Sequence, residues 1–399
     1  MFKYLFKRDT LFATISVFLV MGMFSFIPIN THFLDPIHLA LADFDYNDLA
    51  YAKMHKNENT PADTNLVVVN IGQGSRMDIA NMIAKIDAQK PKVIGVDVLF
   101  KERKDTAADN ALAKHFANNK KIVAAFNYAG EDNHDNKAHV SPQTGAFYNI
   151  GLNNGYANFV GEEEGVVRHF SPFIEGNDGK ELASFASRVV NIANKDAYNT
   201  LKERNNLTEI INYTRKADKY LVIDGMDLLL GKADSSILRN KIVLLGYVSV
   251  SPYDIEDKHF TPMNAKYTGK SLPDMNGIFI HANIINMIQN NDYVHKMPVW
   301  LMWIIGFLLC WLHMALFIKD YLENHIWFHL IAKIAQIISA VFFVYLGLLC
   351  FHQLDTKVNM TATLAAIILA VDVLYFYEAF ATWLHKKYGY QTIFNHQHD

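Results

Sequence analysis

Four long apolar segments interrupt an otherwise polar chain, one near the amino end and three in the last quarter. They cover residues 10–29, 298–318, 327–351 and 359–383. Each is close to the roughly 20 residues that a helix needs to cross a bilayer. The residues between the first two have ordinary soluble composition, so the pattern predicts a membrane protein with one large domain outside the bilayer. The predicted division is residues 1–30, 31–297, 298–385 and 386–399.

Basic residues next to the apolar segments indicate the orientation. Lys3, Lys7 and Arg8 precede the first segment, and Lys386 and Lys387 follow the last. Basic residues close to a span favour the cytoplasmic side, and four spans return the chain to the side on which it began. We therefore expect a protein of the bacterial inner membrane, with both termini cytoplasmic and residues 31–297 in the periplasm or extracytoplasmic space.

The polar region begins with alternating strand and helix patterns. Short apolar runs rich in Val, typical of buried strands, alternate with segments that carry apolar residues on one helical face. The predicted strands are residues 65–72, 92–100 and 120–128, and the predicted helices are residues 75–91, capped by Ser75, and 106–119. Strands and helices that alternate at this spacing form a parallel sheet with right-handed crossovers.

Farther along, the pattern predicts helices at 181–194 and 277–290 and strands at 219–225 and 240–246. The predicted fold is an α/β extracytoplasmic domain with a mainly parallel sheet at its start, plus four transmembrane α-helices. The helix at 277–290 is followed almost directly by the second apolar segment. A short junction of this kind transmits a displacement that a flexible tether would absorb.

A series of short motifs carries a resemblance to a known family. In order along the chain they are VVVNIG, PKVIGVDVLF followed by Asp105 and Asp109, GYANF, EEEGVVRHFSPF, KIVLLG, DKHFTPMN and LPDMNGIFIHANIINMI. This ordered series resembles the type 2 CHASE domain, which implies an extracytoplasmic sensory domain of bacterial membrane receptors, preceded by one span and followed by several. Members of that family usually continue into a cyclase, kinase or phosphatase domain. The residues after the last apolar segment here are too few for one, so we expect action through separate proteins.

The polar stretch YDIEDKHFTPMN, residues 253–264, contains residue types that bind ligands or ions. The candidates are Asp254, Asp257 and His259, together with His281 and with Asp97, which lies towards the carboxyl end of a predicted strand, where ligands of open α/β sheets bind. A structural loop is the competing interpretation, because Asp and Asn near Thr-Pro are common turn residues. Hydrolytic metal catalysis is the third, but no HExxH, GxSxG or paired-cysteine motif supports it. We therefore expect no enzyme, no metal and no cofactor.

Charge and cysteine content narrow the alternatives further. The net charge is -3, and the basic residues form no stripe, which argues against a nucleic-acid partner. Cys310 and Cys350 are the only cysteines, and both fall inside apolar segments. The polar domain must therefore be stabilised by its core without a disulfide.

Ionisable residues inside the apolar segments are functional candidates, since they are costly in a bilayer. Asp372 lies about midway through the last segment and is interpreted either as a protonated residue bonded within the bundle or as a contact for a partner. His313, Lys333 and Glu378 lie at similar counted distances from one face of the membrane. The counting predicts an ion pair between Lys333 and Glu378.

Two classes of function fit these features. In the first, the protein senses a ligand or an envelope condition and relays it through its spans to a partner protein. In the second, it is a structural or accessory subunit of an envelope membrane complex. Both require the lipid bilayer and a protein partner, which is either a different protein or a second copy of the chain.

Overall fold

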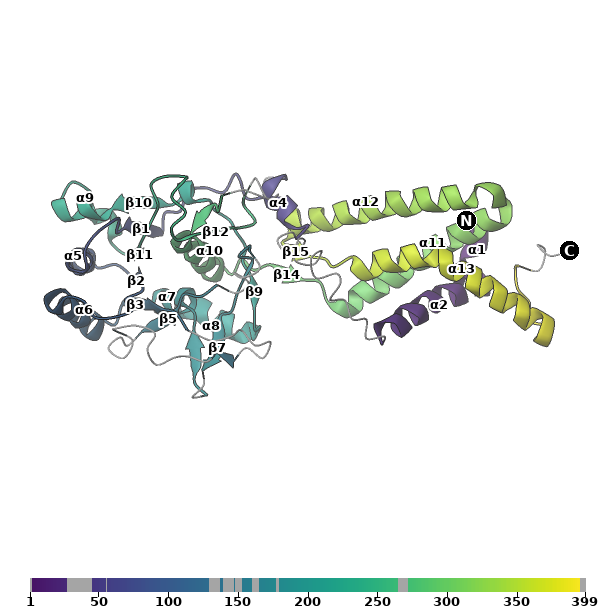
Figure 1. The fold of residues 1–399 in the computed structure, drawn as a ribbon, viewed down its shortest axis with the longest axis horizontal. Coiled ribbons are helices and arrows are strands. Elements are labelled where there is room, and N and C mark those ends of the chain that lie inside the picture. The colour runs from purple at the N-terminus through teal and green to yellow at the C-terminus, as the bar shows by residue number, and fades with distance from the viewer. Residues whose placement is uncertain are drawn as a thin grey trace. The chain divides into compact units, whose positions relative to one another are not determined.

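The chain forms two compact units. A computed structural model describes residues 2–26, 45–54, 56–128, 137–138, 147, 153–159, 165–176, 179–264 and 272–394. One unit comprises Ala40–Val294 and is called the α/β unit below; the other comprises Met1–Leu39 and His295–Asp399 and is called the helical unit. Figure 1 shows the sheet and its helices in the first and the long helices in the second.

A six-stranded parallel sheet forms the centre of the α/β unit. Its strands are, in spatial order, β10 (Leu221–Asp224), β1 (Leu66–Asn70), β11 (Ile242–Gly246), β2 (Val93–Asp97), β3 (Ile122–Phe126) and β5 (Asn154–Tyr156). Every pairing between these neighbours is parallel. The predicted parallel α/β fold is confirmed. β1 and β2 are not neighbours in the sheet, because β11 lies between them. The strands that follow β2 extend the sheet on one side and β10 extends it on the other, so the sheet is wound in two directions from β11.

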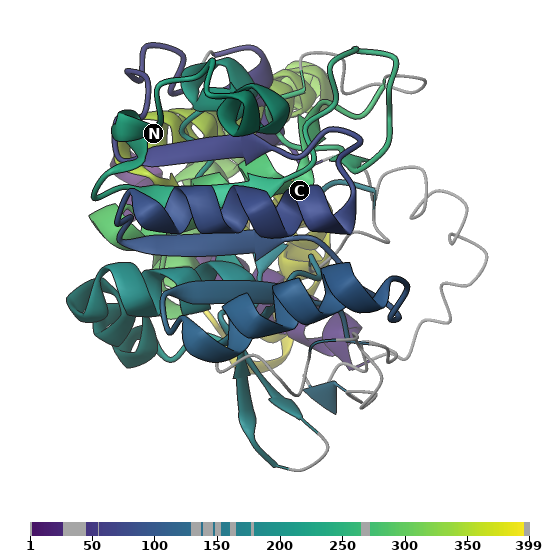
Figure 2. The same ribbon diagram turned by 90° about the vertical axis from the view of Figure 1, so that its left-hand side faces the viewer.

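Helices cover both faces of the sheet. α5 (Arg76–Ala88), α6 (Thr106–Asn118) and α9 (Gly225–Leu230) supply the residues of one apolar core, and Figure 2 shows α5 and α6 crossing that face. α7 (Phe185–Ala193) packs on the opposite face, where a Cβ at Gly95 would lie 2.8 Å from the Phe185 ring. α10 (Gly277–Asn290) packs beside α7 and has the bounds that the pattern predicted. Ser75 caps α5 through the Asp78 N–H, as expected.

Shorter elements complete the α/β unit. They are α4 (Asp48–Ala52), β4 (Lys137–Ala138), β6 (His169–Phe170), β7 (Phe173–Gly176), β8 (Glu181–Ala183), α8 (Lys195–Arg204), β9 (Glu209–Ile210), η3 (Ala217–Lys219), η4 (Ser235–Leu238), β12 (Lys258–His259) and β13 (Met275–Asn276). β12 and β13 form an antiparallel pair directly before α10. This pair positions the loop that carries most of the candidate site.

Among its described residues, the helical unit contains four helices that are long and apolar enough to cross a membrane. They are α2 (Arg8–Ser25), α11 (Val299–Glu323), α12 (Phe328–Leu354) and α13 (Thr361–Tyr388), accompanied by α1 (Phe2–Leu5) and η5 (His325–Trp327). Helices of suitable length and composition are therefore present at the four predicted spans. α13 is the most buried of them, whereas α12 is mostly exposed, with 28% of its most apolar window buried.

A two-residue ladder joins the segment before α11 to the loop between α12 and α13. β14 (His295–Lys296) pairs in parallel with β15 (Thr356–Lys357). The His295 N–H donates to the Asp355 carbonyl at 2.7 Å, and the Met297 N–H donates to the Lys357 carbonyl at 3.1 Å. The entry to α11 is thus bonded to the ends of the other two carboxyl-terminal spans.

Candidate functional site

The carboxyl ends of the central strands place Asp97 beside the first turn of α10. Asp97 ends β2 and pairs in register with Gly246, which ends β11. A Cβ on Gly246 would lie 3.2 Å from the Asp97 Cβ and 2.9 Å from the Ile278 Cδ1. The glycine therefore lets α10 approach the strand ends at the switch point of the sheet, where open α/β folds bind ligands.

The loop after β11 brings Asp257 and His259 to the start of α10. The Gly277 N–H, at the first residue of α10, donates to the Asp257 carbonyl at 3.0 Å. A Cβ on Gly277 would lie 3.3 Å from the Asp257 Oδ1 and 3.5 Å from the His259 Nε2. Asp257 adopts a φ of 55°, a left-handed conformation that Asp tolerates better than most residues. The absence of a side chain at Gly277 thus makes room for both groups.

His281 lies one turn farther along α10 and is 4% exposed. Its ring packs against Phe159 and Phe185, with centroids 4.7 and 5.0 Å away, and the His259 ring also packs against Phe159, with centroids 5.0 Å apart. The His281 Nδ1 is buried and has no hydrogen-bond partner among the residues that the structure describes. A buried polar atom without a partner is uncommon and marks a place where a ligand atom or water gains a hydrogen bond.

The electrostatics of this cluster disfavour the charged forms of Asp97 and His281. Burial, and then the Asp257 carboxylate, raise the pKa of Asp97 to about 7, although His259 opposes this shift. Burial, and then His259, lower the pKa of His281 to about 3. Near neutral pH, Asp97 therefore exchanges a proton and His281 is an uncharged imidazole. The cluster is suited to a proton or a small polar or cationic ligand.

Asp254 does not belong to this cluster. It accepts a hydrogen bond from the Tyr247 hydroxyl at 2.5 Å and from the Glu256 N–H at 3.1 Å. The bond from Tyr247, followed by the one from Glu256, lowers the pKa of Asp254. Asp254 is thus a turn residue, while four of the five predicted candidates lie together. Within the described ranges, no three His, Cys, Asp or Glu side chains are grouped in a way that could hold a metal ion.

A comparison with protein-family models matches residues 29–318 to the CHASE2 domain. The chain belongs to the CHASE2 domain family. CHASE2 domains are extracytoplasmic sensory domains, and the match covers the α/β unit and extends through much of α11. No curated protein and no solved structure matches the chain.

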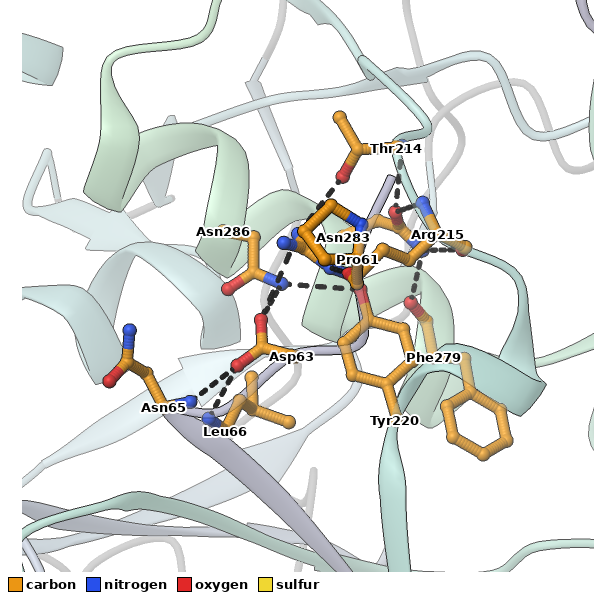
Figure 3. Close-up of polar contacts among 10 residues, drawn as sticks. All are labelled: Pro61, Asp63, Asn65, Leu66, Thr214, Arg215, Tyr220, Phe279, Asn283 and Asn286. Carbon is orange, nitrogen blue, oxygen red and sulfur yellow. Dashed lines mark hydrogen bonds and ion pairs between the residues drawn. The ribbon is translucent and has the colours of Figure 1, made fainter. Parts of the chain in front are cut away.

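The CHASE2 α/β unit also holds a buried carboxylate that the sequence analysis missed. Asp63 is 9% exposed and accepts from the backbone N–H groups of Asn65 and Leu66 at 2.7 and 2.8 Å. It also accepts from the Asn286 amide of α10 at 2.6 Å, and the Arg215 guanidinium lies 3.8 Å away (Figure 3). This network ties the segment before β1 to the second half of α10.

Asn283 completes the attachment of α10. Its carbonyl oxygen accepts from the N–H groups of Thr214 and Arg215, both at 3.0 Å, and its amide donates to the Arg215 carbonyl at 2.9 Å (Figure 3). Asn283 and Asn286 are buried and lie three residues apart on one face of a mostly apolar helix. That spacing was a signal in the sequence. The hydrogen bonds of Asn283 and Asn286, together with the bond from Gly277 to Asp257, hold α10 in place along most of its length.

In the helical unit, the structure does not form the predicted pair of Lys333 and Glu378. Glu378 is 9% exposed and accepts from the Tyr321 hydroxyl of α11 at 2.6 Å, whereas Lys333 is exposed on α12. The contact between His329 and Tyr375, at 3.1 Å, fixes how α12 and α13 align. Lys333 lies four residues after His329, and Glu378 lies three residues after Tyr375. Because the two helices are antiparallel, these steps lead in opposite directions, so Lys333 and Glu378 are about seven residues, or roughly 10 Å, apart along the helix axes. The counted depths were wrong because the helix ends do not lie at one level.

His313 and Asp372 occupy different environments. The His313 Nε2 lies 2.7 Å from the Ser339 Oγ of α12, and its Nδ1 lies 2.8 Å from the Leu309 carbonyl. His313 therefore joins α11 to α12. Asp372 is exposed on the surface of the bundle, so the interpretation of a residue bonded inside the bundle is not supported.

Asp9 is the second carboxylate that the sequence analysis missed. It is 2% exposed and accepts from the hydroxyls of Tyr377 and Tyr390 at 2.8 and 3.2 Å and from the Ile393 N–H at 2.9 Å. α13 ends at Tyr388 and is capped by Gly389, whose φ is 69°, and the chain then turns back so that Phe394 is fully buried in the bundle core. Asp9 looked like a residue flanking a span, because its partners lie far away in the sequence.

Proposed function

We propose that this CHASE2 protein is a receptor of the bacterial inner membrane that passes a change in its α/β unit to a separate membrane or envelope protein. The stimulus acts at the cluster of Asp97, Asp257, His259 and His281, beside the start of α10. Movement of α10 relative to the sheet is the signal, and the bundle presents it to the partner. The protein performs no catalysis.

The junction after α10 carries this proposal. Val294 is 3% exposed and Tyr293 is 4% exposed, with the Arg204 guanidinium 4.0 Å from the Tyr293 ring centroid. The next residue, His295, already belongs to the ladder between β14 and β15. The chain therefore passes from the packed α/β unit to the bonded entry of α11 across one peptide bond, which leaves no flexible tether to absorb a displacement.

The return of the chain after α13 supports a separate partner. If the signal were passed directly along α13 into a following domain, we would expect the helix to continue beyond the end of the bundle. Instead, α13 ends at Tyr388, and after Gly389 the residues up to Phe394 pack against the bundle. The Asp9 end of the bundle is thus a folded surface on which another protein can dock.

The test measures the partner and the junction together. A photo-crosslinking amino acid replaces Lys387, which is exposed at this end of α13, and crosslinked proteins are identified from intact cells. The same experiment is repeated with three residues, Gly-Ser-Gly, inserted between Val294 and His295. A receptor predicts that the insertion changes the yield of the crosslink to the partner. An unchanged yield favours the accessory subunit, and the absence of any crosslinked protein contradicts both.

The orientation has its own measurement. In a variant with Cys310 and Cys350 replaced by Ala, Glu203→Cys on α8 should react with an impermeant thiol reagent in cells whose outer membrane is permeabilised. Lys387→Cys should react only after lysis, because basic residues hold that end in the cytoplasm. Both positions are exposed. The reverse labelling would contradict the assigned topology.

A further inference from the structure

Two opposite charges are exposed on neighbouring membrane helices. Lys333 of α12 and Asp372 of α13 are both exposed on the surface of the bundle, and both lie inside segments apolar enough to cross a membrane. Neither side chain takes part in an ion pair or hydrogen bond with the described part of the chain. An isolated charge on the lipid-facing surface of a span is disfavoured, and such residues pair or contact protein.

The contacts between α12 and α13 place these two charges at the same depth. His329 meets Tyr375 at 3.1 Å, and the Gln336 amide donates to the carbonyls of Ile367 and Ile368, each at 3.0 Å. The helices are antiparallel, so a step forward along α12 corresponds to a step backward along α13. Lys333, four residues after His329, therefore lies at the depth of Val371, four residues before Tyr375. Asp372 follows Val371, so Lys333 and Asp372 differ in depth by about one residue, or roughly 1.5 Å.

The two charges also share one side of the bundle. On α12, Lys333 is four residues from His329 and three from Gln336, so all three lie on one helical stripe. On α13, Asp372 is three residues from Tyr375 and four from Ile368. Since these neighbours make the contacts between the helices, Lys333 and Asp372 border the same seam. A base and an acid thus lie side by side on one exposed surface.

We propose that this surface, defined by Lys333 and Asp372, is the contact between two copies of the chain in the membrane. A two-fold axis along the membrane normal keeps every residue of both copies at its own depth. Because the two charges have equal depth, Lys333 of each copy then faces Asp372 of the other, and both pairs form at once. The surface is self-complementary, which a heterologous partner would not require. This inference does not depend on the proposed sensory function.

The test uses charge reversal in two separately tagged copies. Lys333→Asp leaves two acids on the surface, and Asp372→Lys leaves two bases, so each variant alone should fail to self-associate. Expressed together, the two variants restore both pairs in a mixed dimer. Copurification of one tag with the other should therefore exceed that of either variant with itself by about tenfold, the ratio expected for 1.4 kcal/mol.

Further arms separate contact between copies from contact within one chain. Pairing within one chain predicts no rescue on coexpression, because each variant keeps its own like charges. A chain with both reversals should self-associate but not join the unaltered chain. Neutral Lys333→Met and Asp372→Asn should weaken self-association of the full chain in light scattering, whereas Tyr345→Phe on the exposed face of α12, about 18 Å along the helix, should not.

The outcomes decide the proposal even if a reversed chain inserts poorly. An unaltered chain that is monomeric in lipid nanodiscs overturns it. So does an unchanged monomer–dimer balance in the two neutral variants. Copurification that requires both reversals in one chain, without rescue in the mixed pair, assigns the charges to a single copy and also overturns it.

Discussion

The two units of the protein provide different partners for some of their buried acids. In the α/β unit, two buried carboxylates are met by guanidinium groups: Asp109 by Arg76 and Glu209 by Arg204, each at 2.6 Å. In the helical unit, Asp9 and Glu378 are met by tyrosine hydroxyls and a backbone N–H. An arginine at the rim of the α/β unit keeps part of its charge in water. In a bilayer a second charge would itself need solvation, whereas a tyrosine satisfies an acid without adding one.

The largest expected effect follows from removing an arginine in the α/β unit. Arg76→Met leaves Asp109, whose side chain is 2% exposed, without its cation. Removing one partner of a buried pair costs on the order of 3 kcal/mol. Burial alone would raise the pKa of Asp109, but the bonds from Arg76 and the Lys104 N–H lower it overall.

Chemical denaturation of the full chain, followed by a probe in the α/β unit, measures this loss. Adding Asp109→Leu to Arg76→Met should recover most of the stability, since no charge is then buried alone. Because a lowered carboxyl pKa contributes stability that is lost as pH falls, the difference between the native protein and Arg76→Met should shrink below about pH 4. An equal difference at every pH would show that Arg76 acts by packing alone.

A smaller effect is expected when the helical unit loses one tyrosine hydroxyl. Tyr377→Phe removes one of three donors to Asp9 and should cost about 1–2 kcal/mol, since two donors remain. Thermal unfolding in detergent measures this change, with the exposed Tyr345→Phe as the control. If Tyr377→Phe is as neutral as the control, acids in the bundle do not depend on hydroxyl donors, and the contrast between the units fails.

The smallest effect is a change in the pH dependence of the α/β unit. Asp97 has a pKa near 7 in the fold, above its ordinary value, so its contribution is present at low pH and lost as pH rises from about 4 to 7. His281, with a pKa near 3, has the opposite sign: its neutral form favours the fold, and this stability is lost as pH falls from about 6.5 to 3.

These two opposing trends can be separated by substitution. Asp97→Asn removes the group that becomes charged above pH 7, so the variant should gain stability over the native protein at pH 8 but not at pH 5. We expect a gain on the order of 1 kcal/mol, a modest value because the residue is only half-buried. His281→Phe should flatten the loss between pH 6 and 4. Denaturant midpoints across this range provide the measurement, and an unchanged slope for Asp97→Asn would place the titrating group elsewhere.

The sequence predicted the features that depend on local pattern. Apolar runs identified most of the parallel strands, and the predicted bounds of α10 agree with the structure, in which Asn291 adopts a left-handed φ of 54° just after its last residue. Four candidate residues came together because the carboxyl ends of parallel strands meet at one edge. Asp254 lies apart from the other candidates, and its hydrogen-bond donor Tyr247 lies outside the motif that drew attention to it.

The features that the sequence did not predict depend on contacts between distant segments. Asp9 meets Tyr377 across 368 positions, and Asp63 meets Asn286 across 223. No periodicity records such partners. The depth of Lys333 was also misjudged, because counting from helix ends ignores how α12 aligns with α13, which the contact between His329 and Tyr375 determines.

The short ladder between β14 and β15 implies a periodic response to changes in chain length. Successive residues of a strand face opposite sides, so one residue added before His295 would exchange the two faces of β14, and a second would restore them. If the junction were a flexible tether, each added residue would reduce the coupling to α11 a little further, and the response would fall steadily with the number of inserted residues. This ladder instead predicts an oscillation of period two, in which odd insertions disturb the entry to α11 and even ones return it to phase.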